Sequence, residues 1–229
     1  MTMPERPKPV RPRDAASVVL VRGAGPAAEV LMGRRRRKAA FLPNIYVFPG
    51  GRVDPSDIAA GRAMTLPDVV SESLTRRRGS TPPHGLLVAA IRETFEETGL
   101  LIAEDDPTWR APTGHAESPL WHALTQARAA PGMGRLRYVA RAITPTMSPR
   151  RFNTRFFMAD AEHARGNLLP QSELLDLRWV RLTEATRILP IVDVTEFVLR
   201  TVAAHLAGEA GQRIPLWHYV GGTAHVIYE

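Results

Sequence analysis

The chain of 229 residues contains no cysteine, which excludes a disulfide framework, thiolate metal sites and a cysteine nucleophile. It also lacks long apolar runs. The longest, at 15–21 and 86–91, fall far short of the roughly 20 residues that span a bilayer. Its histidines show no ligand spacing such as His-Glu-X-X-His, so no role is assigned to them. We therefore expect a cytoplasmic protein without a membrane partner.

Lysine is nearly absent as well. Among 30 basic residues only Lys8 and Lys38 are lysines, and the formal net charge is +7 with a pI near 10.6. The planar arginine fork matches phosphate oxygens, so the excess favours an anionic partner. Alternatively, most arginines are solvated, as we expect for 34–37 and 76–78. No helix-turn-helix, RNP-like or zinc-finger pattern accompanies them, so nucleic acid is not favoured as the partner.

The composition, with 44% hydrophobic and 23% charged residues, is that of a globular protein. Residues 1–14 mix prolines with basic residues and lack the apolar region of a secretory signal, so a flexible basic arm is expected there. Residues 15–229 are expected to form a single domain. Within it, periodicity is lost between 52 and 83, which indicates an insertion at about 58–84.

Strand and helix patterns are mixed along the chain. Runs at 15–22 and 29–33 predict a hairpin, and helical spacing at 86–98 predicts a helix that ends at Gly99. An aromatic tail at 217–228 closes the chain. Because strands and helices do not strictly alternate, the fold class predicted is α+β, in the form of an α/β/α sandwich.

The most informative stretch is RETFEETGL at positions 92–100. With 3.6 residues per helical turn, Glu93, Glu96 and Glu97 fall on one face within about one turn. Carboxylates this close repel one another, and a hard divalent cation between them would offset that repulsion. The pattern therefore predicts an oxygen-ligand platform for Mg²⁺ or Mn²⁺ rather than Zn²⁺. A solvated acidic surface is the alternative for the triplet taken alone.

The stretch FPGG at 48–51 precedes this helix, and together they resemble the box of the Nudix hydrolase superfamily. That box reads Gly, five residues, Glu, seven residues, then Arg-Glu, apolar, any, Glu-Glu, any, Gly, apolar. Five residues separate Gly51 from Asp57, an acid where the family has Glu. The arginine expected at position 65 stands at 92, and Thr94 replaces the usual aliphatic residue. This interrupted box, followed by PRRFNTRFF at 149–157, resembles the coenzyme A diphosphatase branch.

The resemblance implies a mixed sheet between helices and metal-dependent hydrolysis of a diphosphate linkage in a nucleotide-derived substrate, with coenzyme A or acyl-coenzyme A as candidates. It also implies roles for individual residues. The ligands of Mg²⁺ or Mn²⁺ would be Glu93, Glu96 and Glu97, one of them a candidate base, joined by the backbone carbonyl of Gly50 or Gly51. Arg92 would orient a carboxylate.

Other candidates lie outside the box. Glu173, in a loop-like segment, is a candidate general base, with an ordinary exposed loop acid as the alternative. Arg151, Arg155 and Phe152 are candidates for substrate binding, because arginine suits a phosphate and an aromatic ring suits adenine. Alternation along a strand would send Arg151 and Arg155 to one face.

Two other functions stay open. One is a Nudix hydrolase of another nucleoside diphosphate derivative, such as ADP-ribose, a nucleotide sugar or a dinucleotide. A non-catalytic Nudix-fold binding module is disfavoured because such modules usually lose the acids that stand here at 93, 96 and 97. Homodimerisation is common in the superfamily, and the residues leave it open.

Overall fold

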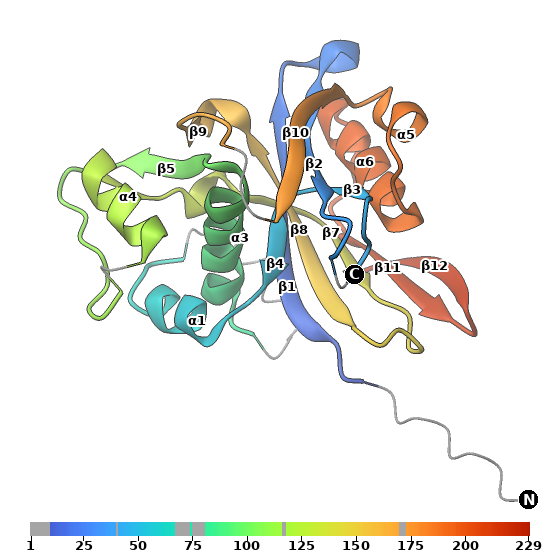
Figure 1. Cartoon of the computed structure of the whole chain (residues 1–229), viewed down its shortest axis with the longest axis horizontal. Helices are drawn as coiled ribbons and strands as arrows, with labels where there is room; N and C mark the ends of the chain where they lie inside the picture. Colours follow the sequence, from blue (N-terminus) through green and yellow to red (C-terminus); the bar gives the residue numbers. More distant parts are fainter. Residues whose placement is uncertain (1–9, 40, 67–73, 75–80, 116–117, 170–172) are drawn as a thin grey trace, which may run out of the picture.

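A nine-stranded sheet forms the middle of the molecule (Figure 1). The structure is a computed structural model that describes residues 10–39, 41–66, 74, 81–115, 118–169 and 173–229. The strands of this sheet are β1 (Arg13–Arg22), β2 (Glu29–Arg35), β3 (Tyr46–Val47), β4 (Gly50–Arg52), β7 (Arg137–Ile143), β8 (Phe152–Asp160), β10 (Leu174–Arg181), β11 (Pro215–Val220) and β12 (Thr223–Tyr228). Their order is β10-β2-β1-β8-β7-β11-β12, with β3 beside β2 and β4 beside β1. The β1–β8 and β7–β11 pairs are parallel and the others antiparallel, so the sheet is mixed.

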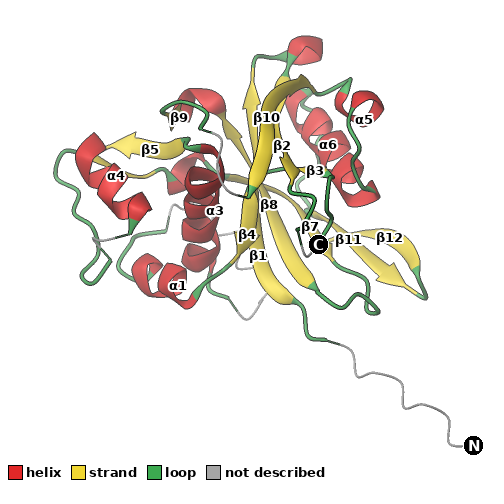
Figure 2. Cartoon of the chain, in the orientation of Figure 1, coloured by secondary structure: helices red, strands yellow, loops and turns green. Residues whose placement is uncertain are grey.

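Helices cover both faces of the sheet (Figure 2). On one side lie α1 (Pro55–Gly61), α3 (Pro83–Thr98) and α4 (Pro119–Ala127), and on the other α5 (Ala185–Ile188) and α6 (Asp193–Leu206). A smaller sheet of β6 (Ala129–Pro131), β5 (Leu101–Asp105) and β9 (Ala164–Arg165) flanks α3 and α4. Short 3₁₀ turns lie at Gly25–Ala27, Met133–Arg135 and Ala161–His163. This arrangement confirms the predicted α/β/α sandwich.

The position of β1 between two layers of helices explains why its sequence is one apolar run. Successive side chains of a strand point to opposite faces of the sheet. Val18 and Leu20 belong to the core cluster that includes residues 86–91 of α3, whereas Val19 and Val21 belong to the cluster that includes Val198 of α6. Since both faces are covered by helices, β1 is apolar at consecutive positions from Val18 to Val21 rather than at alternating ones.

Helix α3 supports the site. Its first turn begins with Pro83, where the missing N–H costs no helical hydrogen bond, so the helix starts three residues before the expected position 86. At its other end Gly99 adopts a left-handed φ of 79° and its N–H donates to the carbonyl oxygen of Phe95. The buried apolar residues of α3 pack on the sheet, which fixes the helix over β1 and β4.

The structure differs from expectation at the C-terminal tail and at the start of β1, and it describes only part of the expected arm and insertion. The expected aromatic tail at 217–228 is in fact the β11–β12 hairpin, which extends the sheet through the parallel β7–β11 contact. Strand β1 begins at Arg13, because its backbone pairs there with β8, so the last two positions of the expected arm at 1–14 belong to the sheet. Positions 1–9 of that arm lie outside the described residues. Positions 67–73 and 75–80 of the expected insertion at 58–84, including Arg76–Arg78, also lie outside the described residues.

Within the described parts of the chain, no helix combines the length and the apolar character that a membrane span requires.

Candidate active site

The glutamates of α3 lie at different depths. Glu97 is only 3% exposed, whereas the side chains of Glu93 and Glu96 are 14% and 39% exposed. Glu93 and Glu97 face strand β4, and Glu96 lies at the rim. Glu97 is therefore buried and Glu93 is largely withdrawn from solvent, which an ordinary solvated acidic face would not require.

Gly50 and Gly51 of β4 allow the backbone to approach these carboxylates. The N–H of Gly50 donates to Oε2 of Glu97 at 2.8 Å. Gly50 has a φ of 153°, and a Cβ there would collide with the backbone of β1 at Ala16 and Ser17. At Gly51 a Cβ would collide with the carboxylate of Glu93. Glycine is required at both positions because the strand is packed between β1 and the two glutamates.

Arg92 connects the acidic residues of α3 to α1. Its Nε and Nη2 donate to the two carboxylate oxygens of Asp57 at 2.8 and 2.9 Å, and Nη1 donates to Glu93 and to Glu96 at 2.9 Å each. Burial alone would lower the pKa of Arg92, but the bond to Asp57 and the nearby carboxylates raise it above its ordinary value. Arg92 therefore stays charged and fixes the orientation of Glu93.

Burial dominates the electrostatics of the two inner glutamates. It raises the pKa of Glu93 to about 7, against the opposing attraction of Arg92. It raises the pKa of Glu97 to about 8, although the Gly50 amide opposes this rise; the charges of Glu93 and Glu173 add to it. Both carboxylates thus carry an uncompensated cost of ionisation, which a nearby hard cation would remove.

The donor chemistry of this region fits a divalent cation. Buried carboxylate oxygens, with the backbone of Gly51 packed against Glu93, are the hard ligands that Mg²⁺ and Mn²⁺ prefer. Among the described residues, however, no three His, Cys, Asp or Glu side chains are already arranged as a ligand set. The predicted set of Glu93, Glu96, Glu97 and Gly51 therefore stays a prediction.

A cleft of about 1080 Å³ opens beside Glu93. Glu93, Gly50 and Gly51 contribute to its lining, together with the aromatic side chains of Phe48 and Phe156. Its remaining walls come from distant parts of the chain, including arginines at 13, 35, 36, 52, 150 and 151 and the aromatic residues Phe41, Phe152, Trp217 and Tyr219. The cleft thus combines acidic, cationic and aromatic groups, as a nucleotide-derived diphosphate would need.

Two of the three predicted substrate-binding residues line this cleft. Arg151 does so while its guanidinium donates to the carbonyl oxygens of Thr144 and Val10 at 3.2 and 2.9 Å. Phe152 lines it too, with its ring edge-to-face against Phe41 at 5.4 Å between centroids. Both are held in place before any ligand binds, which favours binding.

Arg155 lies elsewhere. It is 3% exposed, forms an ion pair with Asp14 and is absent from the cleft lining. The cleft face of β8 is the one that carries Phe152, Thr154 and Phe156, and side chains alternate along a strand, so position 155 faces the opposite side. The expectation that alternation would put Arg151 and Arg155 on one face does not hold because β8 begins only at Phe152. We therefore exclude Arg155 from the proposed substrate site.

Glu173 lies next to the inner glutamates. It is exposed, it lines the cleft with Glu93, and its negative charge contributes to the raised pKa values of Glu93 and Glu97. It directly precedes β10, whose first residue pairs with Arg35 of β2. A loop acid is therefore brought to the same end of the cleft as the helix α3, as a general base would require.

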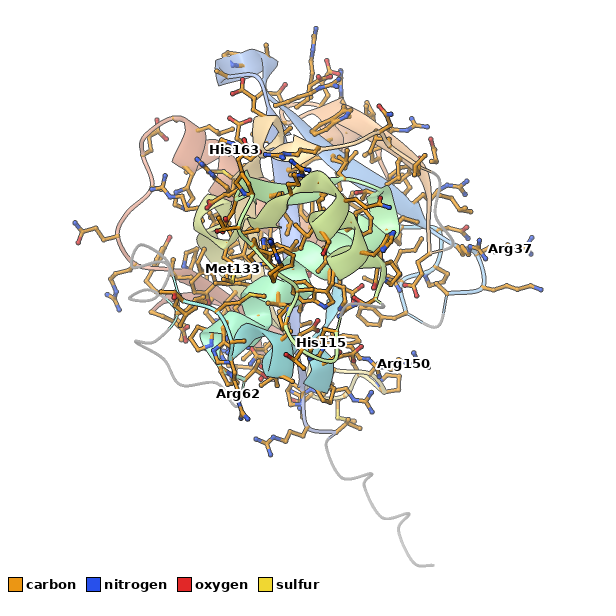
Figure 3. All side chains as sticks on the ribbon, turned by 90° about the vertical axis from the view of Figure 1, so that its left-hand side faces the viewer. Arg37, Arg62, His115, Met133, Arg150 and His163 are labelled. Atoms are coloured by element: carbon orange, nitrogen blue, oxygen red, sulfur yellow. The ribbon has the colours of Figure 1, made fainter. Side chains whose placement is uncertain are left out.

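The arginines expected to be solvated divide into two groups. Arg37 is exposed, and Figure 3 shows its side chain at the outside of the molecule. By contrast, Arg35 ends strand β2 and lines the cleft, where a solvated loop was expected. Strand β2 continues past the expected end at 33, and this continuation is what brings Arg35 to the site.

The mixed sheet between helices, with carboxylates of α3 beside a Gly-Gly strand, places the chain in the class of α/β/α sandwich proteins. The crystal structure of a NUDIX hydrolase from Alicyclobacillus acidocaldarius is similar, with a TM-score of 0.65 and 32% sequence identity over 85% of this chain and 92% of that chain. The chain belongs to the Nudix hydrolase family. No family model matches it.

Two curated relatives are named as acyl-coenzyme A diphosphatases. The chain is 27% identical over 203 residues to NUDT19 of Xenopus laevis, covering 69% of this chain and 53% of that protein. It is 32% identical over 138 residues to NUDT19 of Gallus gallus, covering 46% of this chain and 36% of that protein. The chain thus spans about half the length, or less, of these relatives.

Proposed function

We propose that this protein hydrolyses the diphosphate linkage of a nucleotide-derived substrate in a reaction that depends on Mg²⁺ or Mn²⁺. The observation that carries the proposal is the position of the buried Glu97 and the partly buried Glu93 beside Gly50 and Gly51 at a cleft rich in arginine. Burying two carboxylates without a cation is costly, and the site offers both hard-oxygen donors and cationic groups for phosphate oxygens.

Each residue has a definable part in this reaction. Arg92 holds Glu93 and Glu96 in orientation, and the Gly50 N–H holds Glu97. When bound to these carboxylates, the divalent cation would neutralise charge on the phosphate oxygens and lower the pKa of a water molecule. The attacking water forms a bond to phosphorus while the bond to the bridging oxygen breaks, leaving two phosphomonoesters.

A general base must take the proton from this water. Glu173 is our candidate, because it is solvent-exposed and electrostatically coupled to the inner glutamates. A carboxylate of α3 is the alternative. Arg92 is excluded as a base by its charge. The two candidates differ in the effect that replacing Glu173 should have on kcat.

For the substrate we propose coenzyme A or an acyl-coenzyme A. This follows the named activity of the two diphosphatase relatives and the interrupted box described above. Arg151 would then bind a phosphate and Phe152, with Phe41, would stack on the adenine ring. ADP-ribose, nucleotide sugars and dinucleotides contain the same linkage and are the alternative substrates.

A hydrolysis screen with Mg²⁺ tests the proposal. Coenzyme A, acyl-coenzyme A, ADP-ribose, dinucleotides and nucleoside triphosphates are compared by kcat/KM, and the products are identified by mass. We expect adenosine 3′,5′-bisphosphate and a phosphopantetheine product from coenzyme A. If ADP-ribose or a nucleotide sugar is cleaved about a hundredfold more efficiently than every coenzyme A species, the alternative substrate replaces it. Turnover that survives complete metal removal rejects the proposed metal dependence.

A further inference from the structure

Arg35 stands at the acidic end of the cleft. It is the last residue of β2, where its N–H donates to the carbonyl oxygen of Ile45 and its backbone pairs with Leu174 of β10. These contacts hold its Cα on a rigid strand rather than on a loop. Its side chain lines the cleft together with Glu93 and Glu173.

The guanidinium of Arg35 has no partner among the residues that the structure describes. Its Nε is buried without a hydrogen bond, and its other nitrogens take part in no hydrogen bond or ion pair there. Neighbouring arginines of the cleft differ. Arg52 is ion-paired with Asp54, and Arg151 donates to two backbone carbonyls. A buried guanidinium nitrogen without a partner is costly, so the native protein retains it against a free-energy penalty.

The charge of Arg35 acts on Glu97 of α3. It contributes a small downward effect on the pKa of Glu97, which otherwise rises because of burial. Arg35 therefore lies within electrostatic reach of Glu97. Yet Arg35 forms no ion pair with Glu93, Glu97 or Glu173, so no protein carboxylate occupies its donors within the described chain.

The adjacent Arg34 has a different environment. Its backbone pairs with Tyr46, and its charge acts on Tyr46 and Asp176 rather than on Glu97. It is not part of the cleft lining. Because side chains of a strand alternate, the two arginines serve opposite faces, and only Arg35 points its donors to the cleft.

We propose that Arg35 binds an oxygen of the substrate diphosphate and positions it against the carboxylates of α3. The inference rests on the proposed function, because it takes the ligand to be a diphosphate. The planar fork of arginine matches phosphate oxygens, and a rigid strand holds it at the end of the cleft where the bond is cleaved. Binding satisfies the orphaned donors of Arg35, so substrate is held more strongly than a simple cationic surface would hold it.

Binding of α,β-methylene-ADP, a diphosphate that cannot be hydrolysed at its bridge, tests the inference. Titrations compare the wild-type protein with Arg35→Gln, Arg35→Lys and the control Arg34→Gln, which removes the same charge from the next residue. Each is measured in Mg²⁺ and in excess chelator, and thermal melts verify that the variants fold.

We expect Arg35→Gln to raise Kd by about 10- to 100-fold under both conditions, which is the usual loss for a charged hydrogen bond. Arg35→Lys should recover part of the affinity, and Arg34→Gln should stay within about twofold of wild type. Equal Kd values for Arg35→Gln and Arg34→Gln overturn the inference alone. Wild-type protein that does not bind the analogue overturns it together with the diphosphate site. Arg35-dependent binding without hydrolysis in the substrate screen would instead overturn the proposed function and leave Arg35 as a phosphate-binding residue.

Discussion

Arg92 of α3 is joined to Asp57 of α1 by two parallel hydrogen bonds, of 2.8 Å from Nε to Oδ1 and 2.9 Å from Nη2 to Oδ2. The two residues are 35 positions apart in the chain. Oδ2 of Asp57 also accepts the N–H of Asp54, which closes the capping box of α1. The buried carboxylate of Asp57 therefore completes the cap of α1 and fixes Arg92, which in turn orients Glu93.

Replacing Asp57 by Asn should destabilise the protein strongly. Asp57 is 2% exposed, and its neutralisation removes the charged partner of Nε and Nη2 of Arg92, a change that costs about 3 kcal/mol or more. Urea denaturation measures the free energy of unfolding of this variant and of Asp54→Asn, which changes a more exposed acid of the same turn. A loss for Asp57→Asn no larger than that for Asp54→Asn would show that the pair is not needed for folding.

Gly51→Ala should reduce hydrolysis by roughly 10²-fold while leaving the fold intact, because the added Cβ collides with the carboxylate of Glu93. The matched control is Gly211→Ala, at a position with open space around it. Steady-state kinetics and thermal melts of both variants decide the matter. Wild-type kcat/KM for Gly51→Ala would mean that the close approach of β4 to Glu93 has no part in catalysis.

The α1–α3 contact should weaken in mild acid through His84. Burial lowers the pKa of His84, and the charge of Arg62 adds to this effect. The folded protein therefore binds fewer protons at His84 than the unfolded chain does. This contribution to stability is complete above the unfolded pKa of about 6.5 and is lost as the pH falls through the lower folded pKa.

Thermal melts at several pH values between about 8 and 5.5 test this sign. His84→Gln should lose less stability than wild type on acidification, whereas exposed His225→Gln should follow wild type. A steeper acid loss in His84→Gln than in wild type would contradict the assignment.

Glu173→Gln distinguishes the two candidate bases. If Glu173 accepts the proton of the attacking water, kcat should fall by roughly 10²-fold or more with little change in KM, and the acidic limb of the pH–kcat profile should be lost. Glu162→Gln, which changes an exposed acid outside the cleft, is the control. A fall of less than about threefold in kcat would indicate that a carboxylate of α3, and not Glu173, is the general base.

Much of the fold and part of the site could be predicted from the sequence. The continuous run RETFEETGL determines the helix face and its glutamates, because helical spacing is local. The burial of Glu93 and Glu97 could not be predicted, since it depends on β4 approaching α3 from 47 residues away at Gly50.

Two arginines show the same limit. Arg155 belongs to the PRRFNTRFF segment that suggested substrate binding. The face of β8 on which its side chain lies depends on where the strand begins, and on that face it forms an ion pair with Asp14. Arg35 was assigned to a loop because the apolar pattern stops at Gly33, yet pairing with β10 prolongs β2 to Arg35. Both outcomes depend on strand register, which is set by tertiary contacts rather than by local pattern.

The central claim is that the buried carboxylates of α3 bind the cation needed for hydrolysis. Its most direct test is kcat/KM for coenzyme A as a function of Mg²⁺ concentration in wild type, Glu97→Gln and the surface control Glu104→Gln, which changes an exposed acid paired with Arg135. We expect Glu97→Gln to lose roughly 10²-fold or more in kcat/KM, with metal-free stability preserved because a costly buried charge is removed, while Glu104→Gln behaves as wild type. Near wild-type kinetics and Mg²⁺ dependence for Glu97→Gln would contradict the account.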